Sequence, residues 1–188
     1  MSPAQEPAAE APRAVWADFL ALPDDDRREL IDGSLIEVEM PTDLHEHIVA
    51  WIVGYLFNWV RANGGRVFAS GYKVKIREDR GVMPDVQLYR RENAARGEQG
   101  MEAGRPDLAV EVVSPSSPRY DRVTKLRWYA SIGVPEYWIV DPEARTLERL
   151  RLQEGHYLIA DSLADGETLQ PESFAGLSIP LQELWVVP

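Results

Sequence analysis

The chain has 188 residues, of which 45% are hydrophobic and 27% charged, as in an ordinary globular domain and unlike a collagen or a disordered chain. It contains no cysteine, which excludes disulfides, cysteine-ligated zinc and thiol catalysis. No apolar run approaches the roughly 18 residues of a membrane-spanning helix, and the N-terminus lacks the apolar core of a secretory signal, so we expect a soluble, cytoplasmic protein.

The charge is distributed unevenly along the chain. The formal net charge is −11, which argues against non-specific binding to nucleic acid, because such binding depends on neutralising phosphates. Residues 66–127, however, carry a net charge of +4, and the rest of the chain carries −15. The middle third is therefore the part best able to face an anion.

The N-terminal part predicts a tail followed by short elements. Residues 1–12 are mostly Ala, Pro and Glu and predict a disordered tail, which leaves 13–188 as a single domain. Residues 14–21 can form a short helix that Pro23 stops. Asp32-Gly33 predicts a hairpin turn into a strand at 34–39.

The clearest helix signal covers residues 43–63. Apolar residues there follow the 3.6-residue period, Thr42 or Asp43 can cap the start, and Gly64-Gly65 can end the helix. So many apolar residues indicate a helix that is buried on more than one side.

The remaining elements predict a mixed sheet with a second helix. Pro118 can open that helix behind a Ser117 cap, and Gly133 can close it. The order of elements indicates an α/β (α+β) domain in which helices flank a mixed central sheet, with an extra terminal hairpin. The predicted strands are 67–77, 85–90, 107–113 and 136–141, and the hairpin is 146–151 with 156–160.

Two acids lie where acids are unusual. Asp85 follows a proline at the start of an apolar strand, and Glu111 lies inside the run Leu-Ala-Val-Glu-Val-Val. A lone buried carboxylate costs several kcal/mol unless it is paired, protonated or bound to a metal. Glu111 is therefore either on the polar face of a half-exposed strand or a paired metal ligand. Taken alone, Asp85 fits a strand-start cap better than a functional residue.

The two acids together are more informative than either one. On adjacent strands their carboxylates would lie about 4.8 Å apart, close enough to share one ion. Mg²⁺ takes hard oxygen ligands, usually one or two carboxylates with waters. The backbone carbonyl of Val112, next to Glu111, is a natural third ligand.

The predicted second helix adds candidate polar residues. Asp121, Lys125 and Tyr129 are spaced four residues apart and so lie on one face of a helix. Without further context, Asp121 and Lys125 fit an exposed ion pair worth a few tenths of a kcal/mol.

Several stretches, in consistent order across residues 27–152, resemble the Uma2 family of restriction-type endonucleases, within the PD-(D/E)XK nuclease superfamily. The two longest are the most specific. The matching stretches are ELIDGSLIEVEMP (29–41), His45 at the start of the long helix, MPDVQLY (83–89), RPDLAVEVVSPSS (105–117) and DRVTKLRWYASIGVPEYWIVDP (121–142).

This resemblance implies a restriction-endonuclease-like sheet with catalytic residues at its centre. Asp85 matches the acid of the Pro-Asp motif, and Glu111 matches the second acid. The superfamily usually places its lysine two residues later, where this chain has Val113, and the family position on the next helix maps to Lys125. The implied activity is hydrolysis of phosphodiester bonds in DNA with Mg²⁺ or Mn²⁺, the cation being held by Asp85, Glu111 and Val112.

Other matching positions receive supporting roles from the resemblance. Lys125 would orient the attacking water or stabilise charge on the phosphate, and Asp121 and Tyr129 would position the lysine. Glu37 and His45 match family positions near the front of the site. His45 could serve there as a second base, although a histidine at the start of a helix is more often a structural hydrogen-bond donor.

Two other classes of function are alternatives to the nuclease. The first is a catalytically silent nuclease-fold protein that acts as a binding or regulatory module. The second, an acyl hydrolase, is disfavoured because the chain has no Gly-x-Ser-x-Gly elbow.

The C-terminal end bears on the oligomeric state. Trp185, Val186 and Val187 would suit the contact of a homodimer, and they would equally suit docking onto the chain's own sheet.

Overall fold

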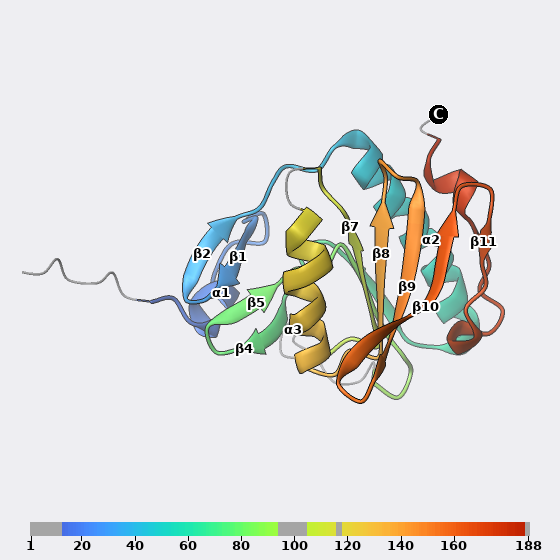
Figure 1. Cartoon of the computed structure of the whole chain (residues 1–188). Coiled ribbons are helices and arrows are strands. Elements are labelled where there is room, and N and C mark those ends of the chain that lie inside the picture. The colour runs from blue at the N-terminus through green and yellow to red at the C-terminus, as the bar shows by residue number, and fades with distance from the viewer. Residues whose placement is uncertain (1–12, 94–104, 116–117, 187–188) are drawn as a thin grey trace, which may run out of the picture.

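The computed structural model describes residues 13–93, 105–115 and 118–186. A six-stranded sheet occupies its centre (Figure 1), with the strand order β10-β9-β8-β7-β6-β3. β7 and β8 are parallel and the other neighbouring pairs are antiparallel, which confirms the mixed sheet. The strands are β3 (Arg66–Ala69), β6 (Val86–Tyr89), β7 (Leu108–Val112), β8 (Glu136–Asp141), β9 (Thr146–Gln153) and β10 (His156–Ala164).

Parts of some predictions lie outside the described residues. These parts are the disordered tail at 1–12, the Ser117 cap and Val187.

A helix covers each face of this sheet (Figure 1). Behind it lies α2 (Asp43–Asn63), whose bounds match the prediction, and Thr42 accepts a hydrogen bond from the His45 amide as its cap. In front lies the second helix, which begins as a π-helical segment, η1 (Tyr120–Lys125), and continues as α3 (Leu126–Ser131). No helix in the described part of the chain is long and apolar enough to cross a membrane.

Alternation along β7 decides what each face of the strand contacts. Val110 and Val112 pack in the core beneath α2, whereas Ala109 and Val113 pack in the core beneath α3. Glu111 alternates with the second set and therefore points toward α3. The second helix covers this side of β7, and Glu111 is buried. The hypothesis that Glu111 lies on the polar face of a half-exposed strand is therefore wrong.

A second, four-stranded sheet packs beside the first, in the order β2-β1-β5-β4. Asp32 and Gly33, both with positive φ, form the predicted turn between its first two strands. The helix α1 (Trp16–Leu20) packs against this sheet. The strands are β1 (Arg28–Ile31), β2 (Ser34–Glu37), β4 (Val74–Arg77) and β5 (Arg80–Val82).

The prediction of one strand over 67–77 is wrong. Residues 66–69 pair with β6 in the large sheet, whereas residues 74–77 pair with β5 in the small one. The chain turns between the two at Gly71, whose φ of +97° is a conformation that suits glycine. The strand β5 was not predicted, because three residues give too short a pattern.

The C-terminal segment closes the open end of the core beneath α2. It contains β11 (Thr168–Leu169), β12 (Ile179–Pro180) and two short 3₁₀ turns, η2 (Glu172–Phe174) and η3 (Leu181–Leu184). Phe174, Leu177 and Trp185 are buried in that core. Trp185 therefore docks onto its own chain and is not available for a dimer contact, whereas Val186 is exposed.

Candidate active site

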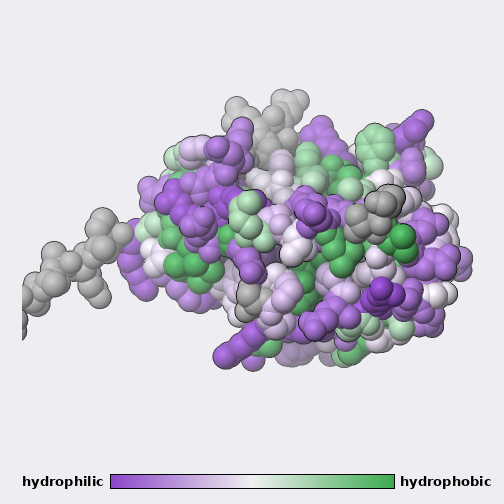
Figure 2. Space-filling model, turned by 90° about the horizontal axis from the view of Figure 1, so that it is seen from above, coloured by the Kyte–Doolittle hydropathy of each residue, from purple (hydrophilic) through white to green (hydrophobic). Residues whose placement is uncertain are grey.

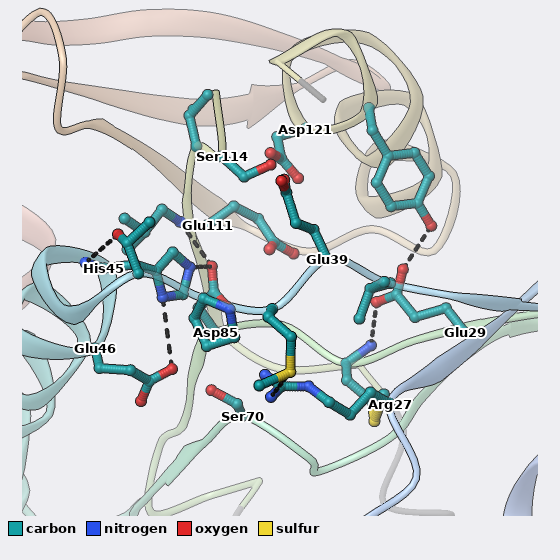
Figure 3. A pocket seen from close by; sticks show the side chains of 18 of the residues that line it. Arg27, Glu29, Glu39, His45, Glu46, Ser70, Asp85, Glu111, Ser114 and Asp121 are labelled. Carbon is teal, nitrogen blue, oxygen red and sulfur yellow. Dashed lines mark hydrogen bonds and ion pairs between the residues drawn. The ribbon is translucent and has the colours of Figure 1, made fainter. Parts of the chain in front are cut away.

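The two predicted acids are neighbours across the strands β6 and β7. Val86 pairs with Val110, which places Asp85 and Glu111 side by side at the next step of the ladder. One carboxylate oxygen of Asp85 accepts a hydrogen bond of 2.8 Å from the Val112 amide. Figure 3 shows both acids at the centre of the pocket. The Asp85 carboxylate thus continues the hydrogen bonding of β7 past the point where β6 begins.

The Val112 backbone lies on the same side of β7 as Asp85. In an antiparallel ladder, the N–H and C=O of one residue point to the same neighbouring strand. Because the Val112 N–H points to Asp85, its carbonyl also lies on the side of β7 that faces the Asp85 carboxylate.

Glu111 is 2% exposed and engages the helix that covers it. One carboxylate oxygen accepts a hydrogen bond of 2.8 Å from Lys125 Nζ, and the other accepts one from the Tyr129 hydroxyl. Burial raises the pKa of Glu111 well above its ordinary value, although the Lys125 ammonium opposes this shift. Glu111 is therefore a buried carboxylate paired with Lys125, and its role as a metal ligand stays a prediction.

Lys125 is a single cation among carboxylates. It is 6% exposed, and its ammonium lies 3.6 Å from both Glu29 and Asp121 in addition to its bond with Glu111. The Tyr120 ring lies on another side, 5.1 Å away. Burial disfavours the ammonium form, but the carboxylates, Glu111 first, outweigh burial and raise the pKa of Lys125 well above its ordinary value. The interpretation of Asp121 and Lys125 as an exposed pair is wrong.

Asp121 is also buried, at 5% exposure. Burial raises its pKa to about 6, with the neighbouring charges of Asp85 and Glu29 adding to the shift and Lys125 opposing it. Asp121 and Lys125 both belong to the π-helical segment, in which one turn is wider than in an α-helix.

His45 reaches the site from the first turn of α2. Its Nε2 lies 3.3 Å from the Asp85 carboxylate, and its Nδ1 lies 3.7 Å from Glu46. That Nδ1 makes no hydrogen bond within the described part of the chain. Burial lowers the pKa of His45, but the Asp85 carboxylate outweighs it, and the net shift is upward.

Glu37 behaves differently from the other predicted residues. It lines the pocket from the end of β2, but it is exposed and lies at the rim.

Two acids near the site were not predicted. Glu29 is 1% exposed and lies beside Lys125, and Figure 3 shows the Glu39 carboxylate pointing toward Asp121 and Ser114. Glu29 precedes Leu30 and Ile31, so an acid at an apolar strand was again the available signal, as it was for Glu111.

These residues line an open pocket of about 1450 Å³ between the small sheet, α2 and the second helix. Twelve of the lining residues are Asp or Glu, whereas Arg27 and Lys125 are the only Lys or Arg among its described lining residues. The protein face seen in Figure 2 is largely hydrophilic, with hydrophobic residues in separate patches.

Of the described Lys and Arg residues in the basic segment 66–127, only Lys125 lines the pocket. Several of the segment's cations are paired with carboxylates instead. Lys75 pairs with Glu78, Arg77 with Asp79, and Arg122 with Asp141.

The donor atoms fit a divalent cation that completes its shell with water. Among the described residues, no three His, Cys, Asp or Glu side chains are arranged to hold an ion together. Asp85, Glu111 and the Val112 carbonyl would supply only part of a shell, which suits Mg²⁺, since it usually keeps several waters and takes further oxygens from a substrate phosphate. The excess of buried carboxylates over cations around Lys125 also favours a bound cation.

Comparison with solved structures defines the class of fold. A protein from Anabaena variabilis ATCC 29413, described as "a putative nuclease belonging to DUF820", has a TM-score of 0.72 with this chain at 22% sequence identity. The match covers 91% of this chain and 97% of that one, so the two proteins share their fold.

The family follows from the sequence. The Uma2 family model, described as "Putative restriction endonuclease", matches residues 16–182. The chain therefore belongs to the Uma2 family, which confirms the resemblance noted from its motifs. No curated protein matches the chain.

Proposed function

We propose that this protein is an endonuclease that hydrolyses phosphodiester bonds in DNA and depends on Mg²⁺ or Mn²⁺. One observation carries the proposal: Asp85 and Glu111 lie side by side in an open pocket, and Lys125 donates a 2.8 Å hydrogen bond to Glu111. Membership of a family whose model is described as "Putative restriction endonuclease" supports the reaction class.

Asp85, Glu111 and the Val112 carbonyl would hold the cation. When bound, a divalent cation supplies positive charge to the phosphate and lowers the pKa of a coordinated water. The Val112 amide keeps the Asp85 carboxylate oriented, and Tyr129 does the same for Glu111. Both ligands are therefore fixed before any substrate arrives, which reduces the reorganisation that binding requires.

Lys125 would act on the reacting phosphate. Its ammonium has three donor protons, of which one is used by Glu111. The others can orient the attacking water or stabilise the negative charge that develops on the phosphate oxygens. Asp121, 3.6 Å away, holds the lysine from its own helix. His45 lies close enough to Asp85 to accept or return a proton at that side of the site, and Glu37 would contact substrate only at the rim.

The acidic lining favours one alternative, a catalytically silent binding or regulatory protein. Twelve acidic residues around the pocket repel a phosphate backbone unless cations intervene. On the nuclease proposal, the divalent cation provides this compensation, so cleavage should depend steeply on its concentration.

A cleavage assay with a matched pair of variants separates the two functions. Supercoiled plasmid and a single-stranded RNA are incubated with wild type, Asp85→Asn and Asp107→Asn, with Mg²⁺ or Mn²⁺. Asp107 is a control because it is another aspartate that accepts a hydrogen bond from a backbone amide, but its donor is Arg90, at the other end of β7. We expect wild type and Asp107→Asn to cleave DNA and Asp85→Asn to lose at least 100-fold. Absence of cleavage by wild type on both substrates, or full activity of Asp85→Asn, would contradict the proposal.

A further inference from the structure

Glu29 is a buried carboxylate that contacts two parts of the candidate site: the backbone that leads to Asp85 and the helical segment that carries Lys125. It lies on β1 of the small sheet and is 1% exposed. One of its oxygens accepts a hydrogen bond of 2.8 Å from the Met83 amide, and the other accepts one of 2.7 Å from the Tyr120 hydroxyl. Figure 3 shows these two contacts on opposite sides of the carboxylate. Lys125 Nζ lies 3.6 Å from the first oxygen.

The contact with Met83 fixes the backbone that leads to Asp85. Only Pro84 separates Met83 from Asp85, and the ring of a proline restricts its own φ and the conformation of the residue before it. A held Met83 amide therefore limits where the Asp85 carboxylate can lie. The Val112 amide, which donates to that carboxylate, reports this position directly.

The contact with Tyr120 fixes the segment that carries the lysine. Tyr120 is the first residue of the π-helical segment, and Lys125 is its last. The Glu29 carboxylate thus holds the start of this segment through Tyr120 and its end through the charge of Lys125.

We propose that Glu29 is a positioning residue that holds Asp85 and Lys125 at the spacing the reaction needs. This inference rests on the proposed nuclease function for its consequence, but the geometric part stands on the contacts of Glu29. A carboxylate is required because the site presents two donors and one ammonium to it. Glutamine has nearly the same shape, but it offers one acceptor oxygen, places an NH₂ donor against the second donor, and carries no charge.

Glu136 provides a matched control for a purely structural role. It is 3% exposed, accepts a hydrogen bond from Trp138 Nε1 and pairs with Arg149 at 3.3 Å. Like Glu29, it is thus a buried carboxylate that accepts a hydrogen bond and lies beside a cation, but it does not line the pocket. Glu29→Gln and Glu136→Gln should therefore both lose stability.

The first readout needs neither metal nor substrate. Hydrogen exchange followed by NMR gives the exchange rate of the Val112 amide relative to that of Val110, which pairs with Val86 in the regular ladder. Global unfolding exposes both amides alike, so their ratio reports the Asp85 contact alone. We expect the ratio to rise at least tenfold in Glu29→Gln and to stay unchanged in Glu136→Gln. A ratio unchanged in both variants would overturn the proposal.

The second readout is the division of a kinetic effect between kcat and KM. With plasmid and Mn²⁺, we expect Glu29→Gln to lose at least 30-fold in kcat while KM changes less than threefold, and Glu136→Gln to keep both values. A raised exchange ratio with an unchanged kcat would also overturn the proposal. If wild type itself does not cleave, the nuclease function fails, and the exchange ratio still decides whether Glu29 holds Asp85 in place.

Discussion

Lys125 Nζ donates a 2.8 Å hydrogen bond to Glu111 across the interface between the second helix and β7. The same ammonium lies 3.6 Å from Glu29 and from Asp121. One cation thus serves three buried carboxylates, and the cluster keeps an excess of negative charge. A divalent cation near Asp85 would offset that excess, and this is the electrostatic basis of the proposed site.

Removing the Lys125 ammonium should destabilise the protein more than removing the charge of one of its carboxylate partners. Lys125→Met leaves three buried carboxylates without a cation and should lower the free energy of unfolding by about 3–5 kcal/mol at pH 7. Glu111→Gln should cost about 1–3 kcal/mol, because Glu29 and Asp121 still compensate Lys125. Urea unfolding measures both values. At pH 5 the carboxyls of Glu111 and Asp121, whose pKa values are raised, protonate more readily, so the difference in unfolding free energy between the two variants should narrow. If the two variants differ in unfolding free energy by the same amount at pH 5 and pH 7, this description of the cluster is wrong.

Asp121 should make the protein less stable as pH rises. Its carboxyl has an ordinary pKa of 3.8 and a folded pKa of about 6. Between these values the folded state keeps a proton that the unfolded state has lost, so its contribution to the free energy of unfolding falls by about 2 kcal/mol from pH 4 to pH 7. Asp121→Asn lacks this dependence. Its stability relative to wild type should therefore increase over that range in urea unfolding, and a constant difference would show that Asp121 does not titrate in this way.

The raised pKa of His45 should depend on Asp85. Burial alone disfavours the imidazolium, and the Asp85 carboxylate at 3.3 Å reverses this effect. In Asp85→Asn the burial remains and the charge is gone, so the His45 pKa should fall below its wild-type value. Because the folded pKa is raised, the stabilisation from this pair is complete below pH 6.5 and is lost as pH rises through the folded pKa. NMR titration of the His45 imidazole signals in wild type and in Asp85→Asn tests the shift, and an unchanged His45 pKa would contradict it.

Substitution of Gly81 in the small sheet should destabilise the protein. A Cβ placed there would lie 2.7 Å from the rings of Phe19 and Trp16. Gly81→Ala should therefore lower the free energy of unfolding by about 1–3 kcal/mol through overpacking. Gly54→Ala is the control, because nothing lies within 4 Å of its Cβ and alanine favours the helix by about 0.5–1 kcal/mol. If thermal unfolding shows Gly81→Ala to be as stable as wild type, α1 does not pack on β5 as described.

Local patterns were sufficient for the elements with a long or clean period. The helix at residues 43–63 repeats its apolar positions over many turns, and its Thr42 cap is found in place. The division of residues 67–77 between two sheets depends on partners distant in sequence, namely β6 and β5, which no local pattern reveals. The burial of Trp185 depends in the same way on contact with the core beneath α2.

The site was predictable to the extent that its residues stand out from their surroundings. Asp85 precedes one apolar strand and Glu111 interrupts another, and the structure places them side by side. The π-helical turn that carries Lys125 has no local sequence signal, and the acidic lining assembles from segments distant in the chain. Glu29 could have been found by the same reasoning as Glu111, because both are acids on apolar strands.

Titration of Mn²⁺ into the metal-free protein by calorimetry tests the central claim most directly. The account predicts that wild type binds the ion, that Asp85→Asn binds it at least tenfold more weakly, and that Asp107→Asn binds it as wild type does. Circular dichroism checks that each variant is folded. Equal affinity of Asp85→Asn and wild type would contradict a site built on Asp85 and Glu111, as would a wild type that binds no Mn²⁺ either alone or with a non-cleavable DNA present.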